Sequence, residues 1–173
     1  MPANIEIKAR ARDFDGLRRR AQAISASAGE TIRQQDTFFI TPRGRLKLRE
    51  LEGVPAQLIY YDRPDQGGPK RSDYRIFETS DPQGLKDMLA LAYGVRGVVR
   101  KTRYLYLAGQ TRIHVDDVEG LGQFMELEVV LRPGQTDVEG QGIAEGLMND
   151  LGVDPADLLE AAYMDLMERG NAS

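Results

Sequence analysis

Short segments of this chain alternate strictly between apolar residues and charges of both signs. In residues 4–10, Ile5 and Ile7 fall on one side of an extended backbone, while Glu6 and Lys8 fall on the other. Residues 44–50 repeat the pattern with basic side chains, and residues 124–130 repeat it with carboxylates. A period of two is typical of a β-strand whose faces meet different surroundings. The chain is therefore predicted to build a sheet that is apolar on one face and ionic on the other.

Eight segments have the residues of strands, and turn-forming residues separate most of them. The predicted strands span residues 4–10, 31–40, 44–50, 57–63, 73–78, 98–107, 112–118 and 124–131. Helices are predicted from Asp13 or Asp15 to about residue 28, over 81–91, over 138–151 and over 155–169. Capping aspartates or an Asp-Pro pair precede three of these helices. No repeat or linker divides the chain, which predicts a single domain over residues 1–173.

This order of elements indicates an α+β protein: an eight-stranded antiparallel β-barrel, closed or nearly closed, with helices packed outside. Barrels ordinarily point apolar side chains inward. Two arrangements of the ionic face are open at this point. It can line the lumen, with helices covering the apolar faces outside, or it can simply meet water on a half-buried sheet.

The composition argues against several classes of function. The 173 residues carry a formal net charge of −4 with bases interleaved among acids, which argues against general binding to nucleic acid. The absence of cysteine excludes disulfides, thiolate zinc sites and a cysteine nucleophile. No segment has the length and apolarity of a membrane span, and no leading stretch resembles a signal peptide. We therefore expect a cytoplasmic protein without a membrane partner.

The residues on the ionic faces have the chemistry of a site for a metal-bound polyphosphate. The basic candidates are Lys8, Arg45, Lys47, Arg49, Arg63, Arg75, Lys101, Arg103 and Arg112. The acidic candidates are Glu6, Asp73, Asp116, Glu126 and Glu128. Guanidinium and ammonium groups bind phosphate oxygens, whereas carboxylates hold divalent cations. Inside a lumen so many cations would repel one another and lose hydration unless a highly charged anion were present, and a triphosphate meets that requirement.

Several motifs resemble the CYTH superfamily, whose members are also called triphosphate tunnel metalloenzymes. Asn4-Ile5-Glu6-Ile7-Lys8 is similar to the Glu-x-Glu-x-Lys signature of that superfamily. The likeness continues through residues 44–50, 99–103, 112–116 and 120–128, so it covers almost the whole chain. In this order the motifs look closest to the group of class IV adenylyl cyclase-like proteins and thiamine triphosphatases.

The resemblance implies an eight-stranded tunnel that binds Mg²⁺ or Mn²⁺ and a small-molecule triphosphate. Carried over by position, the implied metal ligands are Glu6, Asp116, Glu126 and Glu128. The implied phosphate contacts are Lys8, Lys47, Arg49, Arg63, Arg75, Lys101, Arg103 and Arg112. Glu6, Lys8 and Asp116 are the implied catalytic residues.

Three positions carry open alternatives. Asn4 replaces the first glutamate of the signature, and an amide lacks the charge and basicity of a carboxylate, which leaves one or two metal ions open. His114, the only histidine, is either a general base or a structural hydrogen-bonding group. Tyr163 either packs within the last helix or closes a tunnel mouth.

Three functions follow from this pattern. The first is a metal-dependent triphosphatase that hydrolyses tripolyphosphate, thiamine triphosphate or another organic triphosphate. The second is a class IV adenylyl cyclase, which converts ATP to cyclic AMP and pyrophosphate. The third is a non-catalytic module that binds polyphosphate or nucleotide, and Asn4 motivates it. The resembling cyclases commonly dimerise, so a homodimer is left open.

Overall fold

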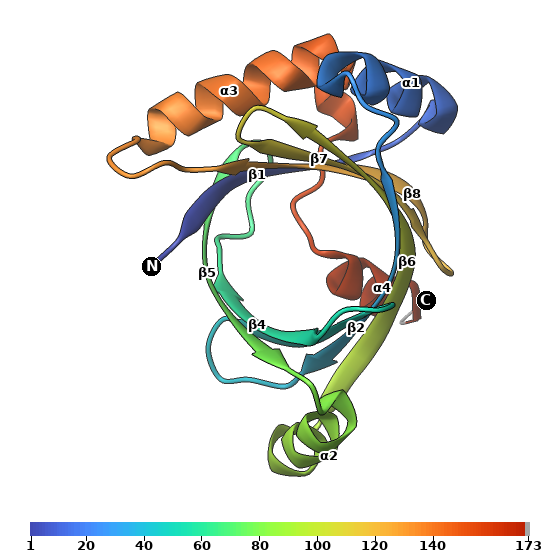
Figure 1. The fold of residues 1–173 in the computed structure, drawn as a ribbon, viewed down its shortest axis with the longest axis vertical. Helices are drawn as coiled ribbons and strands as arrows, with labels where there is room; N and C mark the ends of the chain where they lie inside the picture. Colours follow the sequence, from blue (N-terminus) through green and yellow to red (C-terminus); the bar gives the residue numbers. More distant parts are fainter. Residues whose placement is uncertain (172–173) are drawn as a thin grey trace.

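The strands close into one barrel. The computed structural model describes residues 1–171, with strands β1 (Ala3–Arg10), β2 (Glu30–Phe39), β3 (Arg45–Leu51), β4 (Ala56–Asp62), β5 (Lys70–Thr79), β6 (Val95–Ala108), β7 (Thr111–Val118) and β8 (Gly122–Val130). Their order around the barrel is β1-β5-β4-β3-β2-β6-β7-β8, and β8 pairs with β1 to close it. All neighbouring strands are antiparallel, and they form a ring in Figure 1. The predicted fold class is confirmed.

The apolar strand faces point outward and the ionic faces point into the barrel. Ile5 and Ile7 of β1 are fully buried on the outside, where they pack with Met125 and Leu127 of β8. Helices α1 (Phe14–Ser25) and α3 (Asp137–Asp150) cover this surface, at the top of the ring in Figure 1. Burial of these apolar side chains stabilises the closed sheet from outside. Of the two arrangements open from the sequence, the structure therefore has the charged lumen.

Aspartate caps fix the starts of two helices. Asp13, one of the two predicted caps of α1, accepts a hydrogen bond of 3.0 Å from the backbone N–H of Gly16. Asp81 does the same for α2 (Pro82–Tyr93), which packs on the outer face of β2 and β3 at the lower end of the molecule (Figure 1). Among the described residues, no helix combines the length and the apolar content needed to cross a membrane.

The C-terminal segment differs from its prediction. The predicted helix over residues 155–169 is instead a short 3₁₀ turn (Pro155–Asp157), an extended stretch and α4 (Tyr163–Asn171). The reason lies in β1: β5 begins at Lys70, opposite Glu6, so the second half of β1 has no partner from β5. The backbone N–H of Leu159 donates to the carbonyl of Lys8 at 2.8 Å and fills part of that edge. Pairing with an open strand edge therefore overrides helix propensity here.

Candidate functional site

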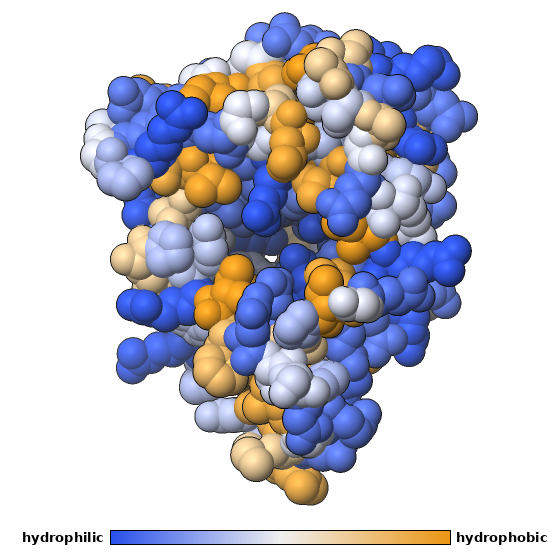
Figure 2. All heavy atoms as spheres, in the orientation of Figure 1, coloured by the Kyte–Doolittle hydropathy of each residue, from blue (hydrophilic) through white to orange (hydrophobic). Residues whose placement is uncertain are grey.

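The barrel encloses a cavity of about 200 Å³ with a largely ionic wall. Charged side chains reach it from β1, β2, β3, β6, β7 and β8 and from Arg63, which directly follows β4. The space-filling view is hollowed at the same place (Figure 2). The charged lining residues are Glu6, Lys8, Asp36, Lys47, Arg49, Arg63, Lys101, Arg103, Arg112, Glu126 and Glu128. Ten of these eleven are predicted site residues, the exception being Asp36, and the lumen therefore collects most of the predicted set.

The cavity opens away from α4. Phe38 and Tyr163, which pack in one hydrophobic cluster at the α4 end, are only 5% and 4% exposed. On β7, Asp116 contacts Tyr163, while Arg112 lies four residues away along the strand and is exposed. Ile76 also lines the cavity and is 49% exposed. A ligand would therefore enter past Arg112 and Ile76 and advance toward α4.

Three carboxylates form a cluster on one side of the lumen. One oxygen from each of Glu6, Glu126 and Glu128 lies within 4.8 Å of the others, because β1 and β8 place Glu6 directly opposite Glu128. Burial and then repulsion from Glu126 and Glu128 raise the pKa of Glu6 to about 7. Three bases border the cluster: Lys8 and Arg103 lie 3.6 and 3.7 Å from Glu126, and Arg63 lies 3.6 Å from Glu6.

Asn4 adds a neutral oxygen beside these carboxylates. It lines the same cavity, two residues before Glu6 on β1, and its amide oxygen is buried without a hydrogen-bond partner among the described residues. A buried polar atom without a partner is costly, so this oxygen suits a ligand that the protein itself does not supply. Three carboxylates and an amide oxygen are the hard ligands that Mg²⁺ and Mn²⁺ prefer. The residues present therefore fit a divalent cation.

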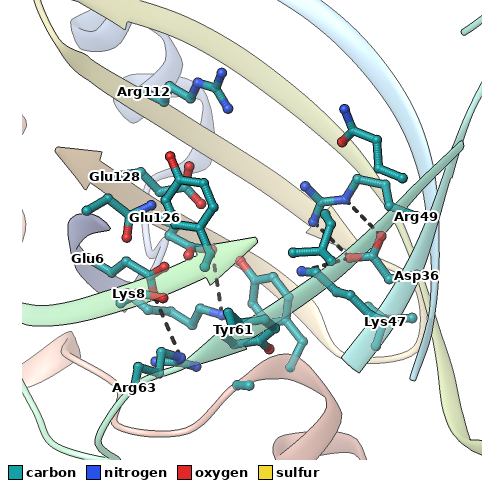
Figure 3. Close-up of a pocket in the computed structure, with 18 of the residues that line it drawn as sticks. Glu6, Lys8, Asp36, Lys47, Arg49, Tyr61, Arg63, Arg112, Glu126 and Glu128 are labelled. Carbon is teal, nitrogen blue, oxygen red and sulfur yellow. Dashed lines mark hydrogen bonds and ion pairs between the residues drawn. The ribbon is translucent and has the colours of Figure 1, made fainter. Parts of the chain in front are cut away.

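A basic group lies on the opposite wall. In the barrel order, β2 and β3 are farthest from β1 and β8, and Figure 3 shows Lys47 and Arg49 across the cavity from the glutamates. Arg49 donates two hydrogen bonds of 2.9 Å to Asp36, and the ammonium of Lys47 lies 3.3 Å from the same carboxylate. Sequence reasoning missed Asp36. Asp36 shares one face of β2 with Gln34 and Phe38, and this alternation could have indicated that it faces the lumen.

Asp116 belongs to a second ionic group, not to the glutamate cluster. Both of its oxygens accept hydrogen bonds of 2.8 Å from Arg103, and Lys101 lies 3.7 Å away. The hydroxyl of Tyr163 donates a further bond of 2.9 Å to it. The structure therefore does not place Asp116 with the predicted metal ligands, and its geometry is that of a counter-ion for two buried bases.

Two predicted positions, Arg75 and Arg45, do not line the cavity. Arg75 is exposed on the outer face of β5, because Tyr74 and Ile76 are the neighbours that point inward. The structure therefore places Arg75 outside the cavity, away from the other predicted phosphate contacts. Arg45 lies on the inner face of β3 but is paired at its end with Asp65 at 2.7 Å. Arg63 remains in the lumen, 3.6 Å from Glu6.

His114 is buried beside the glutamate cluster, directly opposite Glu126 in the pairing of β7 with β8. Its Nε2 atom lies 4.0 Å from an oxygen of Glu128, and its Nδ1 atom has no hydrogen-bond partner among the described residues. Burial, and then the charge of Arg103, hold the pKa of His114 well below its usual range. The imidazole is therefore neutral near pH 7.

The basic residues should take up protons when a polyphosphate binds. Burial and then Arg103 lower the pKa of Lys101 to about 7, while burial and then Arg49 lower that of Lys47 to about 8. At pH 8 Lys101 is mostly neutral, and a bound polyanion favours the charged form, so binding should consume roughly one proton. Calorimetry with tripolyphosphate in buffers of different ionisation enthalpy measures this number. Lys101→Met should lose most of the uptake and weaken binding roughly tenfold to a hundredfold, whereas Arg75→Met should change neither.

The fold and the lumen together define a class of protein: a closed antiparallel tunnel that carries its ionic groups inside. Within this class, the protein-family model described as CYTH domain matches residues 2–163 of the chain. The chain belongs to the CYTH family, whose members are metal-dependent and act on triphosphates. This confirms the resemblance seen in the sequence.

Solved structures share the same fold at low sequence identity. The PH1012 protein of Pyrococcus horikoshii superposes with a TM-score of 0.82 and 23% identity, over 94% of this chain and 98% of that one. HpAC1 of Hippeastrum, described as having a dominant triphosphatase activity, gives 0.69 and 18%, over 98% and 96%. A Vibrio parahaemolyticus protein provisionally described as an adenylate cyclase gives 0.78 and 17%, over 95% and 97%. No curated protein matches the sequence significantly.

Proposed function

We propose that this protein is a divalent-metal-dependent triphosphatase that hydrolyses inorganic or organic triphosphate. One observation carries the proposal: the lumen holds a carboxylate cluster on one wall and basic side chains on the wall opposite. A triphosphate chain with its metal ion has complementary charge to both walls at once. The triphosphatase activity described for HpAC1 gives further support.

The proposed roles follow from where each residue lies. Glu6, Glu126 and Glu128, with the amide oxygen of Asn4, would hold Mg²⁺ or Mn²⁺. When bound, the ion supplies Lewis-acid polarisation of phosphoryl oxygens and neutralises part of their charge. The basic residues bind the remaining phosphate oxygens and orient the chain: Lys8, Lys47, Arg49, Arg63, Lys101, Arg103 and Arg112.

The reaction itself is a transfer of the terminal phosphoryl group to water. An oxygen of water attacks the terminal phosphorus, and the bond from this phosphorus to the bridging oxygen breaks, so tripolyphosphate gives phosphate and pyrophosphate. Most of the protein's contribution is positioning and electrostatic stabilisation by the fixed charges of the lumen. Because the cavity opens past Arg112 and Ile76, an organic group would remain at that mouth.

An adenylyl cyclase is the second candidate, and the open mouth and the Vibrio parahaemolyticus structure favour it. In that reaction the ribose 3′-hydroxyl attacks the α-phosphorus and pyrophosphate leaves. Incubation with ATP, tripolyphosphate and thiamine triphosphate in Mg²⁺ or Mn²⁺, followed by separation of the products, distinguishes the two. We expect phosphate release to dominate. Cyclic AMP as the main product would contradict the triphosphatase proposal.

A non-catalytic binding module is the third candidate, since Asn4 stands where the signature has glutamate. Asn4→Glu separates this candidate from the enzyme. In a triphosphatase the unmodified protein turns over substrate with metal. Tight triphosphate binding without turnover, together with turnover gained in Asn4→Glu, would instead identify a binding module.

A further inference from the structure

Tyr163 places one aromatic ring between two lysines of the lumen. The ammonium of Lys8 lies 3.7 Å from the centre of this ring, and the ammonium of Lys101 lies 4.7 Å from it. Both distances are within the range at which a cation is attracted to an aromatic face. The two lysines come from β1 and β6, which are not neighbours in the barrel. Tyr163, which belongs to α4 and to none of the strands, therefore contacts bases on two separate strands.

The hydroxyl of the same residue contacts a third strand. It donates a 2.9 Å hydrogen bond to Asp116 of β7, a carboxylate that is 0% exposed and already bound by Arg103. A residue that only filled space beside Phe124, whose ring centre is 5.1 Å away, would not need a hydroxyl. A buried tyrosine O–H is costly unless it finds such a partner.

The chain holds Tyr163 in place through a strap, defined as residues 158–165. Its backbone is tied to β1 by the bond from Leu159 to the carbonyl of Lys8, so the strap holds the same lysine by main chain and by ring. Lys70, only 1% exposed, donates to the carbonyl of Glu160 at 2.9 Å. Arg96 of β6 binds Asp165 at the end of the strap. These ties fix the position of the ring relative to both lysines.

We propose that Tyr163 is a positioning residue of the triphosphate site. Its ring holds the ammonium groups of Lys8 and Lys101 at the closed end of the cavity, and its hydroxyl holds Asp116 against Arg103. The strap thus positions two bases at the end of a cavity whose sides are formed by the strands. This inference rests on the proposed function, in that triphosphate is taken as the ligand of the lumen.

The test compares three variants by calorimetric titration of tripolyphosphate in Mg²⁺, with thermal unfolding measured alongside. Tyr163→Leu removes the ring and should weaken binding roughly tenfold to thirtyfold, while Tyr163→Phe keeps the ring and should stay within about threefold of the unmodified protein. Phe124→Leu is the matched control, because it loses an aromatic ring from the same cluster, and it should lower thermal stability without changing affinity. Tyr163→Met serves in place of the leucine variant if that variant does not fold.

Each outcome decides the question. Unchanged affinity in folded Tyr163→Leu or Tyr163→Met overturns the proposal, and so does an equal loss of affinity in Phe124→Leu, which would show a packing role alone. Because the readout is binding, an unmodified protein that binds tripolyphosphate without hydrolysing it would contradict the triphosphatase proposal only. No binding by the unmodified protein would overturn both.

Discussion

Glu126→Gln and Glu128→Gln should each lower turnover at limiting Mg²⁺ or Mn²⁺ by on the order of a hundredfold, since even loss of an outer contact to a metal ligand costs about 10- to 100-fold. Glutamine keeps the shape of the side chain and removes the charge that attracts the ion. Both residues belong to the cluster whose oxygens lie within 4.8 Å of one another. Titration of metal against activity, with metal binding measured separately by calorimetry, gives the size of each effect.

A matched variant shows whether the cluster itself is responsible. Glu78→Gln removes a carboxylate from an exposed position of β5, and it should leave the metal dependence unchanged. Unchanged metal dependence in both cluster variants would mean that these glutamates do not bind the ion, and the proposed site would then be wrong.

The sequence determines much of the lumen through alternation alone. Once Glu6 and Lys8 are assigned to one face of β1, pairing in register brings Glu126 and Glu128 of β8 to the same face. Alternation does not say whether that face meets water or a lumen. That depends on closure, and β1 closes the barrel by pairing with β5 and β8, whose partner residues are more than 60 positions away. Such long-range pairing leaves no local signal.

Arg75 shows a second limit of the sequence pattern. At the start of the predicted strand over residues 73–78, the charges of Asp73 and Arg75 alternate with Tyr74 and Ile76, as in a strand whose charged side chains face a common site. The structure points Tyr74 and Ile76 inward instead, so this strand has the ordinary arrangement with charges toward water. A shift of one residue exchanges the two faces of a strand, and the sequence does not fix the phase of one strand relative to the next.

The local sequence pattern does not predict the extended part of the strap that carries Tyr163. Apolar residues spaced through residues 155–169 favour a helix, and the structure has one only from Tyr163 onward. The extended part exists because the second half of β1 lacks a partner from β5 and pairs with Leu159. An open edge created by strands far away in the sequence decided the local conformation.

Asp116→Asn should lower the free energy of unfolding by about 3–5 kcal/mol, the usual cost of removing one partner of a buried ion pair. Asp116 is fully buried and is the counter-ion of Arg103, at 2.8 Å, and of Lys101, at 3.7 Å. Asparagine can still accept the hydrogen bond from Tyr163, so the variant isolates the lost charge. Urea unfolding followed by circular dichroism, compared with Asp117→Asn at the adjacent exposed position, measures the loss.

Low pH and added tripolyphosphate should each change the stability of Asp116→Asn relative to the unmodified protein in a defined direction. Although burial alone would raise it, Arg103 and Lys101 hold the pKa of Asp116 well below its ordinary value of 3.8. A carboxyl with a depressed pKa contributes stability above its unfolded pKa and loses it as pH falls further, so the difference between the variant and the unmodified protein should persist down to about pH 4. Tripolyphosphate should restore more stability to Asp116→Asn than to the unmodified protein, because an anion in the lumen replaces the missing counter-charge. Equal losses in Asp116→Asn and Asp117→Asn would show that Arg103 and Lys101 do not depend on this carboxylate.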